Sequence, residues 1–197
     1  MNICVFASGS GTNFKAIIEA KKSGIIKSDI SLLITNNSDC GAVSIAKESN
    51  IPVFHISRKI YPNASDEEYA SLFLDKLNEH KINFIVLAGY MKMIDVRIIR
   101  KFPNRIINIH PALLPKFGGK GMYGMNVHKA VIEAGEKESG VTIHYVNENY
   151  DEGKIILQKK VEVSPDDTAE TLQKKVLKLE HKYYAEVIRK IENGEKL

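Results

Sequence analysis

The chain has 197 residues, of which 44% are hydrophobic and 26% charged, and its formal net charge is +4. This composition is typical of a globular protein, and the length is sufficient for a complete hydrophobic core without disulfides or metals. The lysines are scattered and form no dense basic stripe, so the positive charge does not indicate a nucleic-acid binder.

The cysteines and the N-terminus give no sign of a metal-binding, secreted or membrane protein. Cys4 lies in an apolar run, and Cys40 is not part of a CxxC pair, so zinc or redox chemistry is not indicated. No basic segment followed by a long apolar core opens the chain, and no apolar stretch approaches the roughly 18 residues that span a bilayer. We therefore expect a cytoplasmic protein that binds neither membranes nor nucleic acids.

Apolar runs of strand length alternate with helix-like segments through the first half of the chain. Strands are expected at residues 3–7, 30–34, 53–56, 84–88 and 106–109. Helices are expected through Phe14, Ile17 and Ile18, over residues 41–48 and over residues 66–78. Because these strands are continuously apolar, both of their faces should be buried in a parallel sheet. The predicted fold class is α/β, doubly wound, with a mostly parallel sheet and helices on both faces.

The pattern changes after about residue 140. Residues 141–146 and 155–163 resemble strands joined by the turn-rich segment NENYDEG, which predicts a strand pair beside the parallel sheet. A long helix is expected from Thr168 onward, with apolar residues at helical spacing at Leu172, Val176, Leu179 and Tyr183. That spacing predicts a helix packed onto the sheet. The whole chain, residues 1–197, is expected to form one domain.

A loop rich in glycine, SGSGTN at residues 8–13, follows the first strand. Glycines let the backbone approach a ligand, and the positive end of the next helix favours an anion. A dinucleotide is disfavoured because Phe14 stands where the third fingerprint glycine belongs, and ATP is disfavoured because no lysine follows the glycines. A phosphate monoester remains, and the alternative is a tight strand-to-helix turn without a ligand.

Asn108 and His110 lie at the carboxyl end of the apolar strand expected at 106–109, two residues apart and therefore on one face. In open α/β sheets the carboxyl ends of the strands are where ligands bind. Histidine transfers protons near neutral pH, and an asparagine amide donates to a developing oxyanion. A structural histidine is the alternative. The pairing with an amide at this edge favours acyl-type transfer through a tetrahedral intermediate.

The sequence contains no motif for a covalent nucleophile or a metal. A G-x-S-x-G elbow is absent, neither cysteine is beside a histidine, and no H-E-x-x-H or Cys/His cluster occurs. Direct attack by a substrate amine is therefore favoured over an acyl-enzyme. A carboxylate beside His110 would raise the pKa of that histidine. Asp151 is a candidate, although its position in a turn-rich segment, taken alone, favours an ordinary turn aspartate without a catalytic role.

Four segments together resemble the phosphoribosylglycinamide formyltransferase family. They are SGSGTN from residue 8, LAGYMKMI from residue 87, NIHPALLPKFGGKGMYG from residue 108 and NENYDEGKIILQ from residue 147. The similarity covers nearly the whole chain, including the spacing between segments. NIHPALLP is specific to folate-dependent formyltransferases as a group, and the glycine loop with Thr-Asn narrows the choice to this family.

The resemblance implies a reaction and a role for each matching residue. The formyl group of 10-formyltetrahydrofolate would move to the amine of glycinamide ribonucleotide, without a metal. The implied roles are phosphate binding by Gly11, Thr12 and Asn13; catalysis by Asn108, His110 and Asp151; contact of Glu180 with the nucleotide; and folate binding by Met91, Lys92, Met93, Ile94, Asn108 and the loop 146–153. Residues 1–100 would be the nucleotide- and phosphate-binding half, and residues 101–197 the catalytic and folate-binding half. The partners would be these two small molecules, with the chain a monomer or homodimer.

Two departures from the family pattern concern the folate. Many relatives carry arginine where this chain has Lys92, and lysine does not replace arginine in bidentate carboxylate binding. Relatives often have an arginine near the start of the helix at Asp66, where this chain reads ASDE. The loop 115–124 holds four glycines, so we expect it to be mobile and to order over bound substrates. The family also suggests a cis peptide bond between Leu114 and Pro115.

Other functions remain as alternatives. A formyltransferase for initiator methionyl-tRNA would need about a hundred further residues to hold the tRNA, and a formyl-folate hydrolase would carry an additional N-terminal domain. Sugar amine formyltransferases would share the Asn/His/Asp site but would not need the phosphate loop. A non-catalytic phosphate-binding module could dispense with Asn108, His110 or Asp151, all of which are present.

Overall fold

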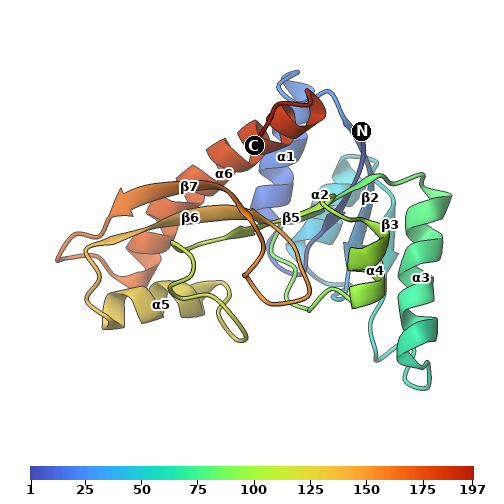
Figure 1. Ribbon diagram of the computed structural model, residues 1–197, viewed down its shortest axis with the longest axis horizontal. Coiled ribbons are helices and arrows are strands. Elements are labelled where there is room, and N and C mark those ends of the chain that lie inside the picture. Colours follow the sequence, from blue (N-terminus) through green and yellow to red (C-terminus); the bar gives the residue numbers. More distant parts are fainter. The chain divides into compact units, whose positions relative to one another are not determined.

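The computed structural model describes residues 1–197 and divides into two compact units, residues 1–106 and residues 107–197. The first unit holds a sheet of parallel strands in the order β3-β2-β1-β4 (Figure 1). These strands are β1 (Asn2–Phe6), β2 (Asp29–Thr35), β3 (Val53–His55) and β4 (Phe84–Leu87). Residues 3–6 of the central strand β1 are completely buried, as their continuous apolar sequence requires.

Two pairs of helices cover the sheet of the first unit. They are α1 (Thr12–Lys22) with α2 (Gly41–Glu48), and α3 (Asp66–Glu79) with α4 (Val96–Lys101). Figure 1 shows the two pairs on opposite faces of the sheet. α3 begins where Ser65 caps it, because the Ser65 side chain accepts from the Glu68 N–H while the Glu68 carboxylate accepts from the Ser65 N–H. The doubly wound α/β arrangement is thus confirmed.

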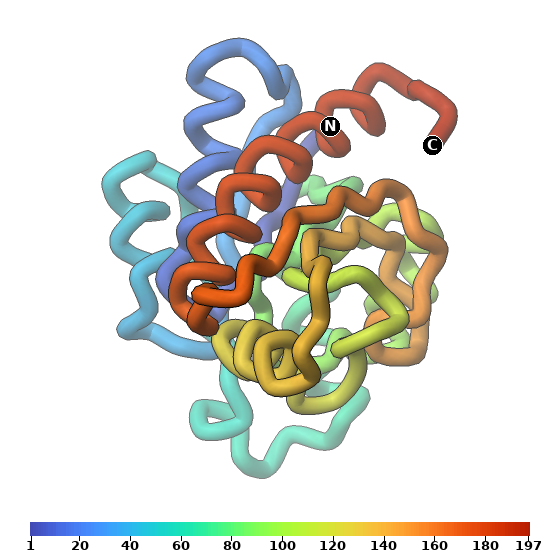
Figure 2. Tube along the Cα trace, turned by 90° about the vertical axis from the view of Figure 1, so that its left-hand side faces the viewer, coloured from blue at the N-terminus to red at the C-terminus, as the bar shows by residue number.

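The second unit holds three antiparallel strands in the order β5-β6-β7. They are β5 (Ile106–His110), β6 (Glu138–Tyr145) and β7 (Ile155–Glu162), and the first residue of β5 is the last residue of the first unit. α5 (Met125–Glu133) packs against α6 (Ala169–Glu192), which also contacts β6 and β7 (Figure 2). The predicted late strand pair and long helix are confirmed.

The apolar stripe of α6 differs from the prediction. Leu172 and Val176 are buried as expected, but the stripe continues through Glu180 and Tyr184, while Leu179 and Tyr183 are only half-buried beside it. The buried positions recur every four residues, and the Tyr184 hydroxyl donates to the Ile107 carbonyl oxygen at 3.2 Å. Hydrophobicity alone predicted Leu179 and Tyr183 as buried instead of Glu180 and Tyr184. The buried face of α6 includes a glutamate and a tyrosine whose hydroxyl is hydrogen-bonded, and a hydrophobic pattern does not select such residues.

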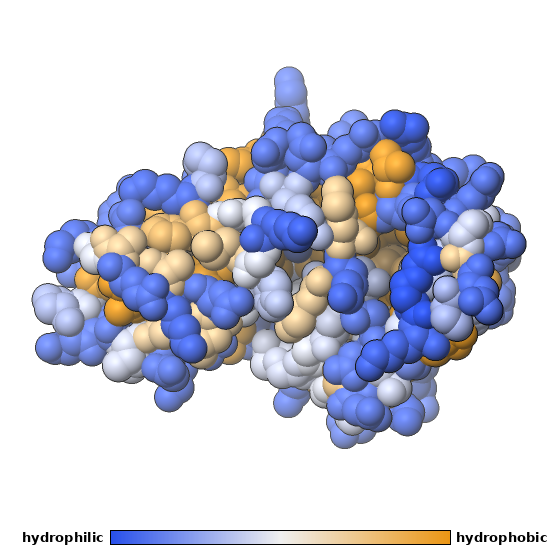
Figure 3. Space-filling view, turned by 90° about the horizontal axis from the view of Figure 1, so that it is seen from below, coloured by the Kyte–Doolittle hydropathy of each residue, from blue (hydrophilic) through white to orange (hydrophobic).

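Two short helices, α4 and α5, were not predicted. α4 has only six residues, too few to establish a periodic pattern, and α5 follows the glycine-rich segment 115–124. The surface drawn in Figure 3 is mostly hydrophilic, with smaller apolar areas between hydrophilic ones. None of the helices combines the length and hydrophobicity that crossing a bilayer requires.

Candidate active site

In the first unit the loop after β1 presents the N-terminus of α1 without a side-chain cap. Gly11 precedes the helix with a φ of 79°, and its carbonyl oxygen accepts from the Lys15 N–H at 2.8 Å. A Cβ on Gly11 would lie 2.8 Å from the Cα of Ala42, so both the backbone angle and the space require glycine. No acidic residue lies in the first turn of the helix. A helix N-terminus of this kind attracts an anion.

The segment after β4 is hydrogen-bonded to the same loop. The Ser8 N–H donates to the Gly89 carbonyl oxygen at 3.0 Å, and the Met91 N–H donates to Ser8 Oγ at 3.2 Å. Met91 and Met93 are 46% and 52% exposed, whereas Ile94 is buried. Exposed methionine side chains adapt to the shape of an apolar ligand, so these two are available to contact one.

In the second unit β5 and β6 place four polar side chains in register. Asn108 lies directly opposite His144, and His110 lies opposite Thr142. Thr142 Oγ1 donates to the Ala112 carbonyl oxygen at 2.6 Å and accepts from the Leu114 N–H at 3.1 Å. These bonds fix the turn that follows the strand. In that turn the Leu114–Pro115 peptide bond is cis, as the family resemblance suggested.

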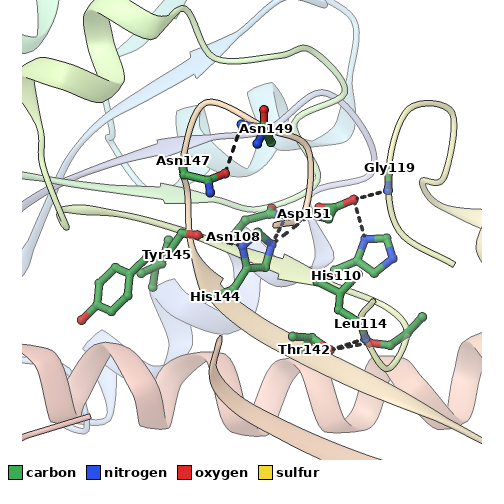
Figure 4. A network of polar contacts seen from close by, with 12 residues as sticks. Asn108, His110, Leu114, Gly119, Thr142, His144, Tyr145, Asn147, Asn149 and Asp151 are labelled. Carbon is green, nitrogen blue, oxygen red and sulfur yellow. Dashed lines mark hydrogen bonds and ion pairs between the residues drawn. The ribbon is translucent and has the colours of Figure 1, made fainter. Parts of the chain in front are cut away.

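Asp151 lies at the centre of a polar network with His110, His144 and Asn108 (Figure 4). One carboxylate oxygen, Oδ2, is 3.6 Å from His110 Nδ1 and accepts from the Gly119 N–H at 2.9 Å. The other, Oδ1, is 3.5 Å from both His144 Nε2 and Asn108 Nδ2. Both histidine side chains and the aspartate side chain are at most 11% exposed. A carboxylate from the turn between β6 and β7, about halfway through the sequence of this unit, thus reaches the end of β5.

The turn between β6 and β7 holds the Asp151 carboxylate next to His110. Asp151 has a φ of 56°, a left-handed conformation that aspartate tolerates better than most residues. Gly153 lets the chain return to β7, because a Cβ there would collide with the Tyr145 carbonyl oxygen. The Tyr145 N–H donates to the Lys154 carbonyl oxygen at 2.9 Å and closes the turn. The left-handed aspartate is therefore held in place by the surrounding turn.

The hydrogen-bond partners fix where the protons of the two histidines lie. His110 Nε2 is 2.8 Å from the Phe117 carbonyl oxygen, which can only accept, so Nε2 carries the proton and Nδ1 faces Asp151. His144 Nδ1 is 2.9 Å from the Tyr145 carbonyl oxygen and donates to it. Its Nε2 is then free to accept from Asn108 Nδ2 at 3.2 Å. The second N–H of Asn108 has only the 3.5 Å contact with Asp151, so a ligand oxygen could replace that weak partner.

Burial and charge act in opposite directions on the histidine and the aspartate. Burial lowers the pKa of His110 below its ordinary value, although the charge of Asp151 and the Phe117 hydrogen bond both act to raise it. Burial acts to raise the pKa of Asp151, but the neighbouring rings of His144 and His110 and the hydrogen bond from the Gly119 N–H together lower it. Asp151 thus raises the pKa of His110 as expected, but burial is the larger effect, and neutral His110 faces ionised Asp151 at neutral pH.

The predicted site residues fall into three groups. Asn108, His110 and Asp151 come together in the second unit. Gly11, Thr12 and Asn13 lie at the start of α1, in the same unit as the segment from Met91 to Ile94. Glu180 lies on α6 and is only 7% exposed, so it is not an ordinary surface carboxylate. No group of three or more His, Cys, Asp or Glu side chains is arranged to hold a metal ion.

Sequence reasoning missed His144 and the two backbone groups that contact the network. His144 is a polar side chain at the end of an apolar run in a strand that is buried almost throughout, and a buried polar group needs a partner, which is the signal that could have drawn attention to it. The contributions of the Phe117 carbonyl and the Gly119 N–H have no signature in side-chain identity. They depend on the path of the glycine loop.

Comparison with known proteins relates the chain to one enzyme family. A sequence profile of the formyl transferase family matches residues 1–188. The phosphoribosylglycinamide formyltransferase of Bacillus subtilis is 38% identical over 187 residues, which cover 95% of this chain and 92% of that protein. The crystal structure of phosphoribosylglycinamide formyltransferase from Bacillus halodurans has a TM-score of 0.89 and 40% identity, covering 97% of this chain and 95% of that one.

A plant relative is more similar in sequence but longer. The chloroplastic phosphoribosylglycinamide formyltransferase of Arabidopsis thaliana is 48% identical over 190 residues, which cover 94% of this chain and 63% of the plant protein. The chain thus spans about three fifths of the length of the plant relatives that it matches. The profile match and the identity to the bacterial protein show that the chain belongs to the formyl transferase family, among the phosphoribosylglycinamide formyltransferases.

Proposed function

We propose that the chain transfers the formyl group of 10-formyltetrahydrofolate to the amine of glycinamide ribonucleotide, a step of purine biosynthesis. The observation that carries this proposal is the buried network in which Asp151 faces His110 Nδ1 at 3.6 Å, with Asn108 on the same strand. The names of the Bacillus relatives support the same acceptor. Both substrates are small molecules, and the reaction needs no metal.

The residues of the network suit direct attack by the amine. The amine nitrogen forms a bond to the formyl carbon, and the carbonyl oxygen of the formyl group gains negative charge. Asn108 stabilises that charge with the N–H whose present contact is the long one to Asp151. His110 accepts a proton from the attacking nitrogen at Nδ1, where ionised Asp151 stabilises the resulting imidazolium. The proton then passes to the folate nitrogen as its bond to the formyl carbon breaks.

Substrate binding is proposed for the remaining predicted residues. Gly11, Thr12 and Asn13 bind the phosphate at the start of α1, which carries no side-chain cap. The apolar folate ring lies along the segment 91–94, where Met91 and Met93 are exposed. Glu180, a buried carboxylate, contacts the nucleotide. In this scheme residues 1–100 bind the nucleotide phosphate and supply the segment 91–94 to the folate, and residues 101–197 carry the catalytic groups and the other folate contacts.

Four further properties are predicted from the sequence. The cytoplasmic location, the monomeric or homodimeric state, and the effects of Lys92 and of the residues around Asp66 on folate binding remain predictions. Near Asp66 the structure places one arginine from a different sequence position: Arg58 contacts Asp66 and lies 4.1 Å above the ring of Tyr69. This arginine is engaged within its own unit.

The proposal is tested by a steady-state assay that follows loss of the formyl group by absorbance, with and without glycinamide ribonucleotide. Turnover that requires the amine supports the proposal. Loss of formyl without the amine would identify a formyl-folate hydrolase instead. Turnover with a different phosphorylated amine, and none with this one, would keep the transfer chemistry but replace the acceptor.

A further inference from the structure

A cavity of about 170 Å³ lies in the second unit, beside the catalytic network but separate from it. Its apolar walls are Leu113, Phe117 and Val131, which come from the turn after β5, the glycine loop and α5. An enclosed apolar cavity of roughly 150 Å³ holds benzene, whereas this one is partly open, with the exposed side chains of Lys116 and Glu138 at its edge. The volume here therefore suits one six-membered ring.

Ser139 gives this cavity a polar group without a partner. The residue lies near the start of β6, lines the cavity and is 2% exposed, and its hydroxyl has no hydrogen-bond partner. Leaving a buried hydroxyl unsatisfied is unfavourable, and most such groups in folded proteins find a partner. A ligand bearing one hydroxyl or carbonyl group would supply the missing hydrogen bond after a small shift of the wall.

The charged residues around the cavity are already paired. Lys116 and Glu136, which both line it, form an ion pair at 2.7 Å, and Glu138 pairs with Lys160 at 2.7 Å. The two pairs contribute no net charge, so neither a cation nor an anion finds an unmatched partner here. The cavity is therefore suited to a neutral ligand.

Phe117 connects the cavity with His110. Its side chain lines the cavity, while its carbonyl oxygen accepts from His110 Nε2 at 2.8 Å. Its φ of 57° is uncommon for a residue with a side chain. A ligand that packs against the ring of Phe117 therefore acts on a residue whose backbone is already bonded to the catalytic histidine.

We propose that this cavity binds a neutral molecule of one six-membered ring with a hydroxyl or carbonyl group, and that its occupant affects His110 through Phe117. The ligand class follows from the volume, the unpartnered hydroxyl of Ser139 and the matched charges. The site is distinct from the proposed substrate positions and does not depend on the identity of the formyl acceptor.

The test titrates phenol into the full chain and records methyl resonances of Leu113 and Val131 together with the ring resonances of His110. Saturable shifts at both groups are expected, with one dissociation constant on the order of 1 mM. Toluene, which lacks the hydroxyl, should bind about fivefold more weakly. Saturable methyl shifts without any change at His110 would overturn the coupling through Phe117.

Variants separate this site from general binding of phenol to the protein. Ser139→Ala should remove the preference for phenol over toluene, while Ser71→Ala, on the exposed side of α3, should retain it. Leu113→Phe and Val131→Phe should each fill the cavity and abolish the saturable shifts, and the first changes a residue that is only half-buried. Absence of saturable shifts in the wild-type chain, or their persistence when a folded variant fills the cavity, would refute the site.

Discussion

Asp151 contacts two histidines and a backbone N–H from a left-handed position in the turn after β6. Each contact has a separate effect: the charge acts on the proton affinity of His110, and the Gly119 N–H ties the glycine loop to the carboxylate. His144 and Asn108 share its other oxygen. A substitution that keeps the size of the side chain but removes the charge therefore tests the electrostatic role with the least change in packing.

Asp151→Asn should lower kcat by about 100-fold or more, because the imidazolium formed on His110 loses its counter-charge. The sign of the accompanying pKa change follows from the same contact. Asp151 acts to raise the pKa of His110, so removing its charge lowers that pKa further. Activity that requires neutral His110 should then persist to lower pH than in the wild type. The pH profile of kcat and an NMR titration of the His110 ring measure the two effects.

Glu152→Gln is the matched control for this prediction, since it removes a carboxylate from the same turn. Glu152 is exposed and accepts from Asn149 Nδ2 at 2.9 Å. Its substitution should leave kcat, measured at saturating 10-formyltetrahydrofolate, within about twofold of the wild type, as for an ordinary surface change. Equal losses in both variants would show that the turn, and not the charge at residue 151, matters.

Gly11→Ala should weaken binding of the nucleotide phosphate and destabilise the first unit. Alanine at this position meets both an unfavourable φ and a contact of 2.8 Å with the Cα of Ala42. Gly24→Ala has nearly the same φ, 78°, but no atom within 4 Å of the added Cβ. The control should lose about 1 kcal/mol of unfolding free energy, from the backbone angle alone. Gly11→Ala should lose more unfolding free energy than this control. Chemical denaturation measures the stability of the two variants, and isothermal titration calorimetry measures their affinity for the nucleotide phosphate. Equal stability and equal phosphate affinity in the two variants would contradict the role of the contact.

At the scale of elements, hydrophobic periodicity predicted the strands and the long helices, because the positions of their apolar residues follow from which face of each element is buried. α2 begins and ends at the predicted residues, and most predicted strands differ from the observed ones by a residue or so at an end. β6 is the larger difference, since it begins at Glu138, before its apolar run, because its pairing with β7 extends to Glu162. Pairing between distant segments is not visible in a local pattern.

The same limit applies to the site. Asn108 and His110 could be predicted as a pair, because alternation along one strand places them on one face. Asp151 required the family resemblance, since only the antiparallel pairing of β6 with its neighbours brings its turn to the end of β5. His144 was missed for that reason, and Glu180 could not be recognised as buried from its position in a helix.

The loop 115–124 is expected to become more ordered when both substrates bind. It already contacts the network through the Phe117 carbonyl and the Gly119 N–H, while its four glycines permit other conformations. Hydrogen exchange of its amides should slow by about tenfold or more in the ternary complex relative to the free chain. Amides of α3, in the other unit, serve as an internal reference. Unchanged exchange in the loop with both ligands present would refute the expectation.

At the scale of the whole molecule, buried histidines should make the protein less stable in acid. Burial, together with the charge of His110, lowers the pKa of His128 from 6.5 to about 4, and burial also lowers the pKa of His110. The unfolded chain therefore binds more protons than the folded one below pH 6.5. Stability present above that pH is lost as the pH falls toward 4. The contribution of His128 is on the order of 3 kcal/mol at most.

Urea unfolding at pH 7 and pH 5 measures this effect in the wild type and in His128→Gln. The wild type should lose unfolding free energy on acidification, and the variant should lose less, because glutamine does not titrate. His128 Nδ1 is buried without a hydrogen-bond partner, so the substitution removes no bond at that atom. An identical pH dependence in both proteins would contradict a lowered pKa for His128.

The most direct test of the proposed reaction follows an isotopically labelled formyl group in a single turnover. The wild-type chain is mixed with labelled 10-formyltetrahydrofolate and glycinamide ribonucleotide, and mass spectrometry determines which product carries the label. We expect the label on the ribonucleotide amine, and a rate at least about 100-fold lower in His110→Ala. Label recovered as free formate, or an equal rate of transfer in the variant, would contradict formyl transfer by the Asn108, His110 and Asp151 network.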